Sequence, residues 1–267
     1  MTAESVGIVS ALWRYPVKSM QGEELSTLTL TEAGCAGDRS HALIDTEDGT
    51  VVSAKNVRHW PNLLGYRARL TEGPPKAVVI TLPDGREFSS TNPDINDILT
   101  AALGRKVTLQ NEPSGQPVLQ QFHPDLESLG RPEKITTEAM LASTFFDMSV
   151  FHLLTTATLR HLESLYSSGS FPVRRFRPNL VLETPSKVQG FIENQWVGRV
   201  IRIGSSVRLR VTEPTMRCVM TTLSQKDAPK DLEILRAAVR HNQGAVGAYV
   251  TVLHGGEVKN GDVCSLE

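Results

Sequence analysis

Cys218 is the residue of this chain with the clearest chemical potential. It follows Arg217 in the segment Glu213-Pro-Thr-Met-Arg-Cys-Val-Met-Thr-Thr-Leu, directly after an alternating strand pattern at 207–211. A thiolate binds soft metals, and an adjacent guanidinium favours this charged form of the side chain. A free cysteine is also a common core residue. The sequence around Cys218 therefore leaves two alternatives, a metal-binding thiolate or a buried thiol.

Two segments near the N-terminus carry polar donors. In Tyr15-Pro-Val-Lys-Ser19, Lys18 and Ser19 offer an ammonium group and a hydroxyl after a proline that restricts the backbone. The second segment, Gly37-Asp38-Arg39, offers a guanidinium. Each segment has a structural alternative, a surface turn for the first and a turn in which Asp38 pairs with Arg39 for the second.

A basic stretch precedes and includes Cys218. Residues 171–220 hold nine arginines and lysines against three acidic residues, although the whole chain has a formal net charge of −1. Within Arg174-Arg-Phe-Arg-Pro-Asn179 the guanidinium groups suit phosphate oxygens, and Arg177 and Asn179 present donors at the start of a strand. The alternatives are a solvated β face for the stretch and an arginine–carboxylate pair for Arg177.

Composition sets limits on the class of protein. The 267 residues, 40% hydrophobic, suffice for one large or two small domains, and the near-zero net charge gives no field that would recruit nucleic acid or a membrane. Three cysteines without a Cys-x-x-Cys pair argue against a disulfide framework, a zinc ribbon and a bound iron–sulfur cluster. The sequence shows neither a signal-peptide pattern nor a long apolar run, so we expect a soluble protein in the reducing cytoplasm.

The first half of the chain is dominated by strand patterns. We expect strands at 6–12, 25–30 and 107–110, hairpins at 42–53 and 77–88 around Asp-Gly turns, and a helix at 94–103 that stops at Gly104. Residues 111–135 are rich in Pro, Gly, Gln and Glu, which is typical of a partly mobile connection between domains. This pattern predicts domains at 1–115 and 136–267, joined by a connecting segment at 116–135.

The second half combines strands with two helices. Apolar spacing at Leu159, Leu162 and Tyr166, after Thr155-Thr156, predicts a helix capped by a threonine, and a second helix is predicted at 231–241. Strands are expected at 180–183, 200–203 and 207–211, and a closing hairpin that runs from 249–253 through Gly255-Gly256 to Val258. Without regular alternation of strands and helices, the pattern favours a mainly β (α+β) protein whose second half is a β-barrel decorated by helices.

Five ordered motifs carry a resemblance to a known family. Tyr-Pro-Val-Lys-Ser, Gly-Asp-Arg, Phe-Arg-Pro-Asn, Arg-Cys-x-x-Thr-Thr and Gly-x-x-x-Lys-Asn-Gly-Asp resemble, in this order, the MOSC-domain family. The resemblance is to members with an N-terminal β-barrel domain, such as the mitochondrial amidoxime-reducing component and its bacterial relatives. It implies an N-terminal β-barrel-like domain followed by a C-terminal MOSC β-barrel with peripheral helices.

The resemblance also implies a ligand. In that family a molybdenum cofactor, a pyranopterin dithiolene that ends in phosphate, lies between the two domains and is ligated through molybdenum by a cysteine. Carried over, this makes Cys218 the metal ligand and Asp147 an acid close to the metal. The same comparison assigns to the phosphate or pterin Lys18, Ser19 and Arg39.

Further cofactor contacts are implied for the second domain. Arg177 and Asn179 would hold the pterin, and Arg217 would lie beside the metal ligand. Thr155, at a helix N-terminus, matches a hydroxyl position that contacts the cofactor, and Tyr249 matches an aromatic near the pterin. One departure concerns the loop after Cys218, which reads Thr-Thr-Leu-Ser-Gln where the family has Thr-Thr-Val-Asp-Pro, and this leaves the structure of the loop open.

By resemblance, the function is a molybdenum-dependent oxidoreductase that reduces N-hydroxylated or related N-oxygenated small molecules. The chain has no cysteine cluster of its own, so electrons would come from a separate flavin or iron–sulfur protein. No pyridoxal phosphate is expected, because the lysine-bearing domain of cofactor sulfurases is missing. The alternative is a carrier of the molybdenum cofactor, or of sulfur on Cys218, without turnover. Other catalytic patterns, such as Gly-x-Ser-x-Gly or a P-loop, do not occur.

Overall fold

The computed structural model describes residues 4–73, 76–126 and 130–267. The chain forms two compact units, each assembled from segments that are distant in the sequence. Unit 1 contains the residues up to Trp13, Glu24–Ala36 and Ser149–Glu267, and unit 2 contains Arg14–Glu23 and Gly37–Met148. The linear division expected from the sequence is simpler than this, since the chain passes from one unit to the other several times.

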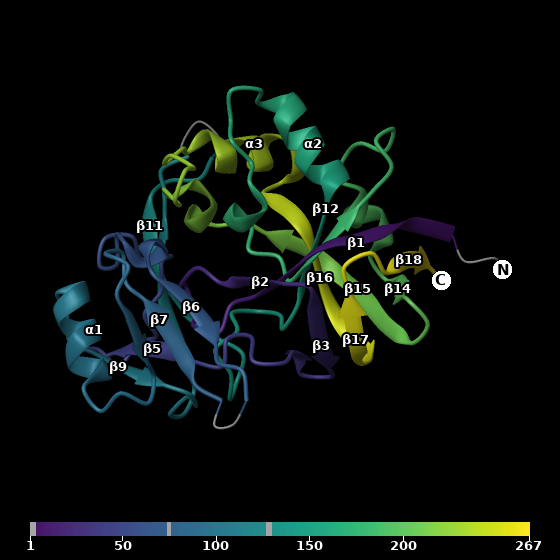
Figure 1. The fold of residues 1–267 in the computed structure, drawn as a ribbon. Helices are drawn as coiled ribbons and strands as arrows, with labels where there is room; N and C mark the ends of the chain where they lie inside the picture. Colours follow the sequence, from purple (N-terminus) through teal and green to yellow (C-terminus); the bar gives the residue numbers. More distant parts are fainter. Residues whose placement is uncertain (1–3, 74–75, 127–129) are drawn as a thin grey trace. The chain divides into compact units, whose positions relative to one another are not determined.

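A closed seven-stranded β-barrel forms the centre of unit 1 (Figure 1). Its strands run in the order β13-β12-β16-β15-β14-β18-β1, and pairing between β13 and β1 closes the ring. The β12–β13 pair is parallel and the other pairs in the ring are antiparallel. The strand bounds are β1 (Glu4–Arg14), β12 (His152–Thr155), β13 (Leu180–Glu183), β14 (Val200–Ile203), β15 (Val207–Met216), β16 (Ala245–His254) and β18 (Val263–Leu266).

Alternation of side chains builds the core of this barrel. In β15, Val207, Leu209 and Val211 are buried, whereas the residues between them are partly or fully exposed. Because successive side chains of a strand point to opposite faces, this pattern fills the interior with apolar groups and leaves arginines outside. The expected β-barrel of the second half is therefore confirmed, and β15 is longer than the 207–211 pattern predicted.

Two helices and three short 3₁₀ helices surround the barrel. Helix α2 (Thr156–Leu165) and helix α3 (Glu233–Asn242) confirm the helices expected from apolar spacing. The 3₁₀ helices are η3 (Val173–Arg175), η4 (Ile192–Trp196) and η5 (Val219–Thr222). A second apolar cluster packs α2 and α3 together through residues that include Leu162, Phe176 and Ile234.

The expected closing hairpin is wrong. Strand β17 (Gly256–Lys259) pairs with β3 (Thr27–Thr31) rather than with β16, and β4 (Gly34–Cys35) continues that sheet. The short β2 (Glu23–Leu25) pairs at the edge of the sheet that forms the barrel. A side chain at Gly255 would bring its Cβ to 2.4 Å from the carbonyl oxygen of Leu30. The glycine therefore allows a close approach to β3, whereas the sequence suggested a tight turn.

Unit 2 contains three small antiparallel sheets, β6-β7-β8, β5-β9 and β10-β11, and one α-helix among its described residues. Their bounds are β5 (Ala42–Asp45), η1 (Leu63–Gly65), β6 (Arg67–Leu70), β7 (Val78–Thr81), β8 (Glu87–Ser89), α1 (Ile95–Leu103), β9 (Val107–Gln110), β10 (Val118–His123) and β11 (Lys134–Ala139). The hairpin expected at 77–88 and the helix ending at Gly104, with φ 70°, are confirmed. In the 42–53 region β5 pairs with β9, and only a single bridge joins Ile44 to Val51.

Part of the expected connecting segment is a strand. Residues 118–123 form β10, which pairs with β11 over its whole length. Leu119 is buried against Met140 and Phe145 in an apolar cluster of unit 2, and Gln121 lies on the same face of the strand. The sequence did not show the alternation of apolar and polar residues in this strand, because the polar residue Gln121 occupies an inward-facing position. Residues 127–129 of this segment lie outside the described residues.

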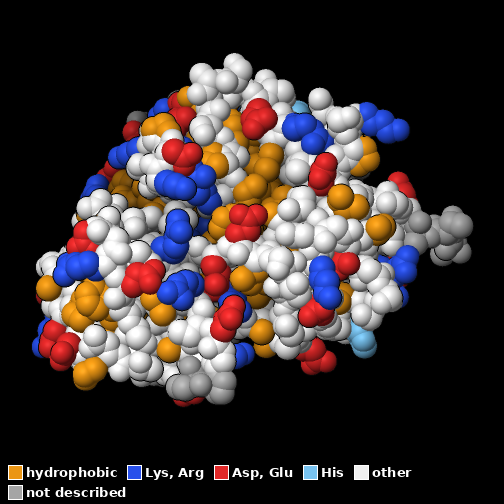
Figure 2. Space-filling model, viewed as in Figure 1, with side chains coloured by type: hydrophobic (Ala, Val, Ile, Leu, Met, Phe, Trp, Pro, Cys, Tyr) orange, Lys and Arg blue, Asp and Glu red, His pale blue; other side chains and the backbone are white. Residues whose placement is uncertain are grey.

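Charges of both signs are spread over the surface. On the face drawn in Figure 2, Lys and Arg side chains lie among Asp and Glu side chains without a large patch of one sign. This agrees with the formal net charge of −1. Within the ranges that the structure describes, no helix combines the length and apolar character needed to cross a bilayer.

Candidate functional site

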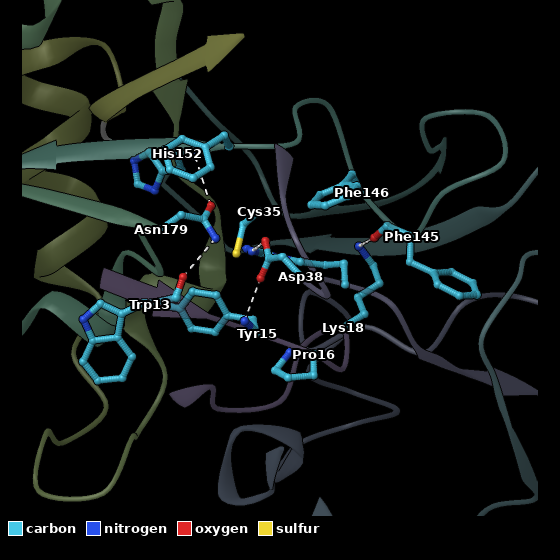
Figure 3. A network of polar contacts seen from close by, with 12 residues as sticks. Trp13, Tyr15, Pro16, Lys18, Cys35, Asp38, Phe145, Phe146, His152 and Asn179 are labelled. Carbon is cyan, nitrogen blue, oxygen red and sulfur yellow. Dashed lines mark hydrogen bonds and ion pairs between the residues drawn. The ribbon is translucent and has the colours of Figure 1, made fainter. Parts of the chain in front are cut away.

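In unit 2, Asp147 lies between two lysines. The ammonium group of Lys18 forms an ion pair with Oδ1 of Asp147 and donates a hydrogen bond of 3.0 Å to the carbonyl oxygen of Phe145, toward which it points in Figure 3. Lys55 approaches the other carboxylate oxygen, with 2.9 Å between Nζ and Oδ2. Both lysines are largely buried, with side-chain exposures of 7% and 12%, whereas Asp147 keeps 30%. Sequence reasoning paired neither lysine with Asp147 and missed Lys55 entirely.

The environment sets the protonation of this group. Burial, with a smaller contribution from Lys55 and against the opposing effect of Asp147, lowers the pKa of Lys18 to about 8. For Asp147, burial by itself would raise the pKa, but the two lysines outweigh burial and hold that pKa well below its ordinary value. At neutral pH Asp147 is therefore a carboxylate, which accepts hydrogen bonds and has no proton to donate.

Arg39 is placed by an aspartate and two aromatic rings. Asp38 accepts a 2.6 Å hydrogen bond from the backbone N–H of Tyr15 and forms an ion pair with the Arg39 guanidinium. That guanidinium lies 4.7 Å from the ring centroid of Tyr15 and 5.7 Å from that of Phe146. The turn pair that was the structural alternative for this motif is thus present. Phe146 precedes Asp147, so the structure brings Arg39 to the segment that carries the carboxylate.

Three of the predicted site residues have strained backbones. Ser19, Arg39 and Arg177 have φ values of 64°, 47° and 53°, and they belong to a set of six non-glycine residues with positive φ in the described ranges. This left-handed conformation costs a residue with a side chain about 1–2 kcal/mol. Such strain persists where the surrounding structure imposes it, and it gathers at functional sites. The backbone therefore supports the choice of these motifs independently of their side chains.

In unit 1, Cys218 is the accessible cysteine. It is partly exposed at the junction of β15 and η5, whereas Cys35 and Cys264 are buried. Its carbonyl oxygen accepts hydrogen bonds from the N–H (3.2 Å) and hydroxyl (3.0 Å) of Thr221. Burial raises the pKa of the Cys264 thiol to about 12. The alternative of a buried core thiol thus describes Cys264 and does not describe Cys218.

Arg175 holds the loop that follows Cys218. This fully buried residue donates hydrogen bonds to four carbonyl oxygens, those of Ser170, Thr221, Leu223 and Pro229, at 2.8, 3.1, 3.0 and 2.6 Å. Its neighbour Arg174 pairs instead with Asp227 on the surface. Two of the three clustered arginines, Arg174 and Arg175, are therefore engaged by the chain itself.

The departure from the family pattern after Cys218 has a structural counterpart. Gln225 is buried, and its side chain donates a 3.4 Å hydrogen bond to the carbonyl of Met220. Its backbone exchanges two hydrogen bonds with Ala228, at 2.9 and 2.8 Å. The loop is therefore ordered by an amide and by Arg175 at the point where the family pattern has an aspartate and a proline.

Arg217 and Asn179 tie the surroundings of Cys218 to the barrel. The backbone N–H of Arg217 donates to Gly244, and its guanidinium donates a 2.7 Å hydrogen bond to the carbonyl of Phe176. Asn179 is buried. Its Oδ1 accepts from the N–H of His152 at 3.1 Å, and its Nδ2 donates to the carbonyl of Trp13 at 3.3 Å, as Figure 3 shows. Asn179 thus links β1 and β12.

Thr155 has a structural task in this protein. It is buried, and its hydroxyl accepts a hydrogen bond from the N–H of Thr158 as the N-cap of α2, as the sequence predicted. The buried carboxyl of Glu193 accepts from the Thr155 N–H at 2.7 Å and from the Thr158 hydroxyl. Burial raises the pKa of Glu193. The expected anion position at this helix end is therefore filled by the chain's own carboxyl group.

Tyr249 lies half-buried on β16, opposite His152 of β12. The two rings meet edge to face with their centroids 6.1 Å apart. Among the described residues, no group of three or more His, Cys, Asp or Glu side chains is arranged to hold a metal ion.

Comparisons with known proteins agree with this architecture. The MOSC N-terminal beta barrel domain matches residues 6–115, and the MOSC domain matches residues 141–265. The YUAD protein from Bacillus subtilis is 12% identical over 100% of this chain and 96% of that chain, with a TM-score of 0.48. YiiM from Geobacillus stearothermophilus is 12% identical over 57% of this chain and 73% of that chain, with a TM-score of 0.32. No curated protein matches the chain. On the two domain matches, this chain belongs to the MOSC-domain family and carries its N-terminal beta barrel domain.

Proposed function

We propose that this protein binds the molybdenum cofactor and reduces N-hydroxylated or related N-oxygenated small molecules. MOSC domains are associated with this cofactor in general. The observation that supports the proposal most directly is the partly exposed thiol of Cys218, on a loop that Arg175 and Arg217 hold in place. When bound, the cofactor would supply two-electron redox chemistry at molybdenum, for which a soft thiolate is a suitable ligand.

The donor set of the chain fits the parts of such a cofactor. Lys18 and Arg39, with Ser19 beside them, offer charged and hydroxyl donors suited to a phosphate. Arg177, Arg217 and Asn179 lie in the segments around Cys218 and offer donors to the polar edge of a pterin. Thr155 and Tyr249 remain candidates, with Thr155 restricted by its role as the cap of α2.

Asp147 has a defined part in this scheme. Since it is a carboxylate at neutral pH, it would accept a hydrogen bond from an N–H or O–H group of the substrate and orient it. Reduction of R–NHOH to R–NH₂ and water consumes two electrons and two protons. A separate flavin or iron–sulfur protein of the cytoplasm would supply the electrons, and Lys18, with a pKa of about 8, can carry a proton near neutral pH.

Metal analysis of protein from a host that makes the cofactor tests the proposal. We expect close to one molybdenum and one pterin for each chain, and turnover of a model N-hydroxylated amidine with an artificial electron donor. Cys218→Ala should lose this turnover, whereas the buried-cysteine control Cys264→Ala should keep its molybdenum. Full activity in Cys218→Ala would rule out the thiolate ligand.

The accessible Cys218 thiol also favours a second candidate function, a carrier of the cofactor or of sulfur. A carrier would hold the cofactor, or a persulfide on Cys218, without reducing the substrate. Mass spectrometry of the intact protein distinguishes the two. A mass increase of one sulfur atom on Cys218, together with no turnover of any N-hydroxylated compound, would replace the reductase proposal with this one.

A further inference from the structure

Lys55 is the unassigned member of the charged group around Asp147. The two oxygens of that carboxylate are divided between two ammonium groups, Oδ1 with Lys18 and Oδ2 with Lys55. A long, charged side chain held at 12% exposure gives up conformational entropy and hydration. A side chain with these costs stays buried only where other contacts hold it there.

The backbone fixes Lys55 firmly. Its N–H donates to the hydroxyl of Ser53 at 3.2 Å, and its carbonyl accepts a 2.9 Å hydrogen bond from the N–H of Phe122 in β10. The next residue, Asn56, is buried and donates to the side chain of Gln120 at 2.8 Å. The segment is thus attached to β10 at Lys55 and at Asn56, and the ammonium group reaches Asp147 from a backbone that is held in place.

Lys18 gains from this arrangement. Of its three N–H donors, one is directed to the Phe145 carbonyl and one to Asp147, and the described residues offer no third acceptor. If Lys18 were the only cation beside Asp147, both oxygens of the carboxylate would attract the N–H donors of Lys18. Because Lys55 pairs with one oxygen of the carboxylate, Asp147 attracts the N–H donors of Lys18 less strongly.

The local charge balance favours an anion. Lys18, Lys55 and Arg39 face Asp147 and Asp38, which gives three positive groups against two negative groups within unit 2. The surplus of one positive charge, next to a lysine with a donor to spare, suits a doubly charged oxyanion such as a phosphate.

We propose that Lys55 is a positioning residue that holds Asp147 by its second oxygen, so that Lys18 keeps an N–H available for an anion of the phosphate class. The inference rests on the proposed function only in identifying that anion with the phosphate end of the cofactor. Lys55 acts through Asp147 and need not touch the anion itself. Its effect should therefore depend on the presence of the Asp147 carboxylate.

The test uses the protein without cofactor and inorganic phosphate as the probe. Pulses of an amine-acylating reagent, followed by mass spectrometry of the Lys18 peptide, give the extent of acylation against pH and the protection by phosphate at pH 7. In the wild type we expect half-maximal acylation near pH 8, in line with the pKa of Lys18, and protection that saturates with phosphate. Lys55→Met should move the acylation profile to higher pH and weaken phosphate protection by about tenfold.

Three further variants make the result specific. Lys55→Arg should restore both readouts, because it returns a cation to Asp147, and the exposed-lysine control Lys106→Met should match the wild type. In an Asp147→Asn background, Lys55→Met should have little further effect on phosphate protection, since the group through which Lys55 acts has lost its charge. The acylation profile should still move to higher pH there, because Lys55 also lowers the pKa of Lys18 directly. Lys55→Gln replaces Lys55→Met if the apolar variant does not fold by circular dichroism.

An acylation profile and phosphate protection in Lys55→Met equal to those of the wild type would overturn the inference. So would an undiminished effect of Lys55→Met on phosphate protection in the Asp147→Asn background, which would make Lys55 a direct anion contact. None of these readouts involves molybdenum. A protein that binds no molybdenum but shows the expected Lys18 acylation and phosphate protection would refute the proposed function and support this inference. A protein that binds molybdenum but lacks the expected Lys18 acylation and phosphate protection would support the proposed function and refute this inference.

Discussion

The guanidinium of Arg175 donates a 3.1 Å hydrogen bond to the carbonyl of Thr221, in the short helix that begins directly after Cys218. The same side chain also reaches the carbonyls of Leu223 and Pro229 further along the loop. A member of the arginine cluster whose guanidinium groups suit phosphate oxygens therefore serves as the internal support of the loop that carries the thiol. The geometry of Cys218 depends on a residue with no access to a ligand.

Arg175→Met should destabilise the protein and loosen this loop. Four carbonyl oxygens would lose a charged donor, which we expect to cost about 2–4 kcal/mol in free energy of unfolding. Equilibrium urea denaturation measures the loss. Arg174→Met is the matched control, because its partner Asp227 is exposed, and a surface pair of this kind contributes under about 1 kcal/mol. Equal losses of unfolding free energy in the two variants would contradict the role of Arg175 in holding the loop.

Thiol chemistry should single out Cys218 in the native protein. We expect an aromatic disulfide reagent to titrate one thiol before unfolding and three after it, since Cys35 and Cys264 are buried. The high pKa of Cys264, about 12, makes that thiol slower still. Cys218→Ser should abolish the native reaction, and Cys264→Ser should not change it. A native reaction that survives in Cys218→Ser would show that the buried cysteines are accessible.

Acid should destabilise the protein through Asp147. The pKa of Asp147 in the folded protein lies below its ordinary value of 3.8. A group of this kind contributes its full stabilisation above the unfolded pKa and loses it as the pH falls toward the folded pKa. Unfolding free energies measured at pH 7, 4 and 3 should therefore fall steadily below pH 4.

Asp147→Asn should weaken that dependence. The asparagine would leave two buried lysines without their carboxylate and cost about 2–3 kcal/mol at pH 7, somewhat less than a fully buried pair because Asp147 is 30% exposed. Its curve of unfolding free energy against pH should be flatter than the wild-type curve below pH 4. Parallel curves for the two proteins would exclude Asp147 as the source of the acid sensitivity.

Glu193 should change the stability of the protein with pH in the opposite direction to Asp147. Burial raises its pKa above the ordinary value of 4.5, so the folded state binds a proton more tightly than the unfolded state. Stability from this group is then present at low pH and declines as the pH rises above 4.5. Glu193→Gln keeps the hydrogen-bonding shape and should remove the decline, whereas Glu193→Ala should cost about 2–3 kcal/mol. Thermal unfolding between pH 5 and 8 distinguishes these outcomes, and a steeper decline in Glu193→Gln would refute the assignment.

Local signals in the sequence were sufficient for most elements. Thr155 with the apolar spacing after it predicted both the start of α2 and its cap, and Gly104 predicted the end of α1. The pairing of strands was less accessible, because pairing depends on contacts between distant segments. Gly255 illustrates this limit, since its role is to approach Leu30 and a local turn pattern contains no information about that partner.

The candidate site likewise contains residues that local motifs singled out and residues whose roles only the folded structure reveals. The motifs singled out Ser19, Arg39 and Arg177, and all three have positive φ. Nothing local separates Arg175 from Arg174, because burial on η3 decides their different roles and depends on the folded loop. Lys55 has no motif around it. Only the attachment of its segment to β10 brings it to Asp147.

The closure of the barrel by β1 has a consequence for the order of events during synthesis. β1 is made before its partners β13 and β18, which follow more than a hundred residues later, so it leaves the ribosome without them. The segment Gly37–Met148 of unit 2 is complete before those partners emerge. We therefore expect unit 2 to become protease-resistant on stalled nascent chains first. The strand β1 would meanwhile be exposed to chaperones, which places the hazard of misassembly at this strand.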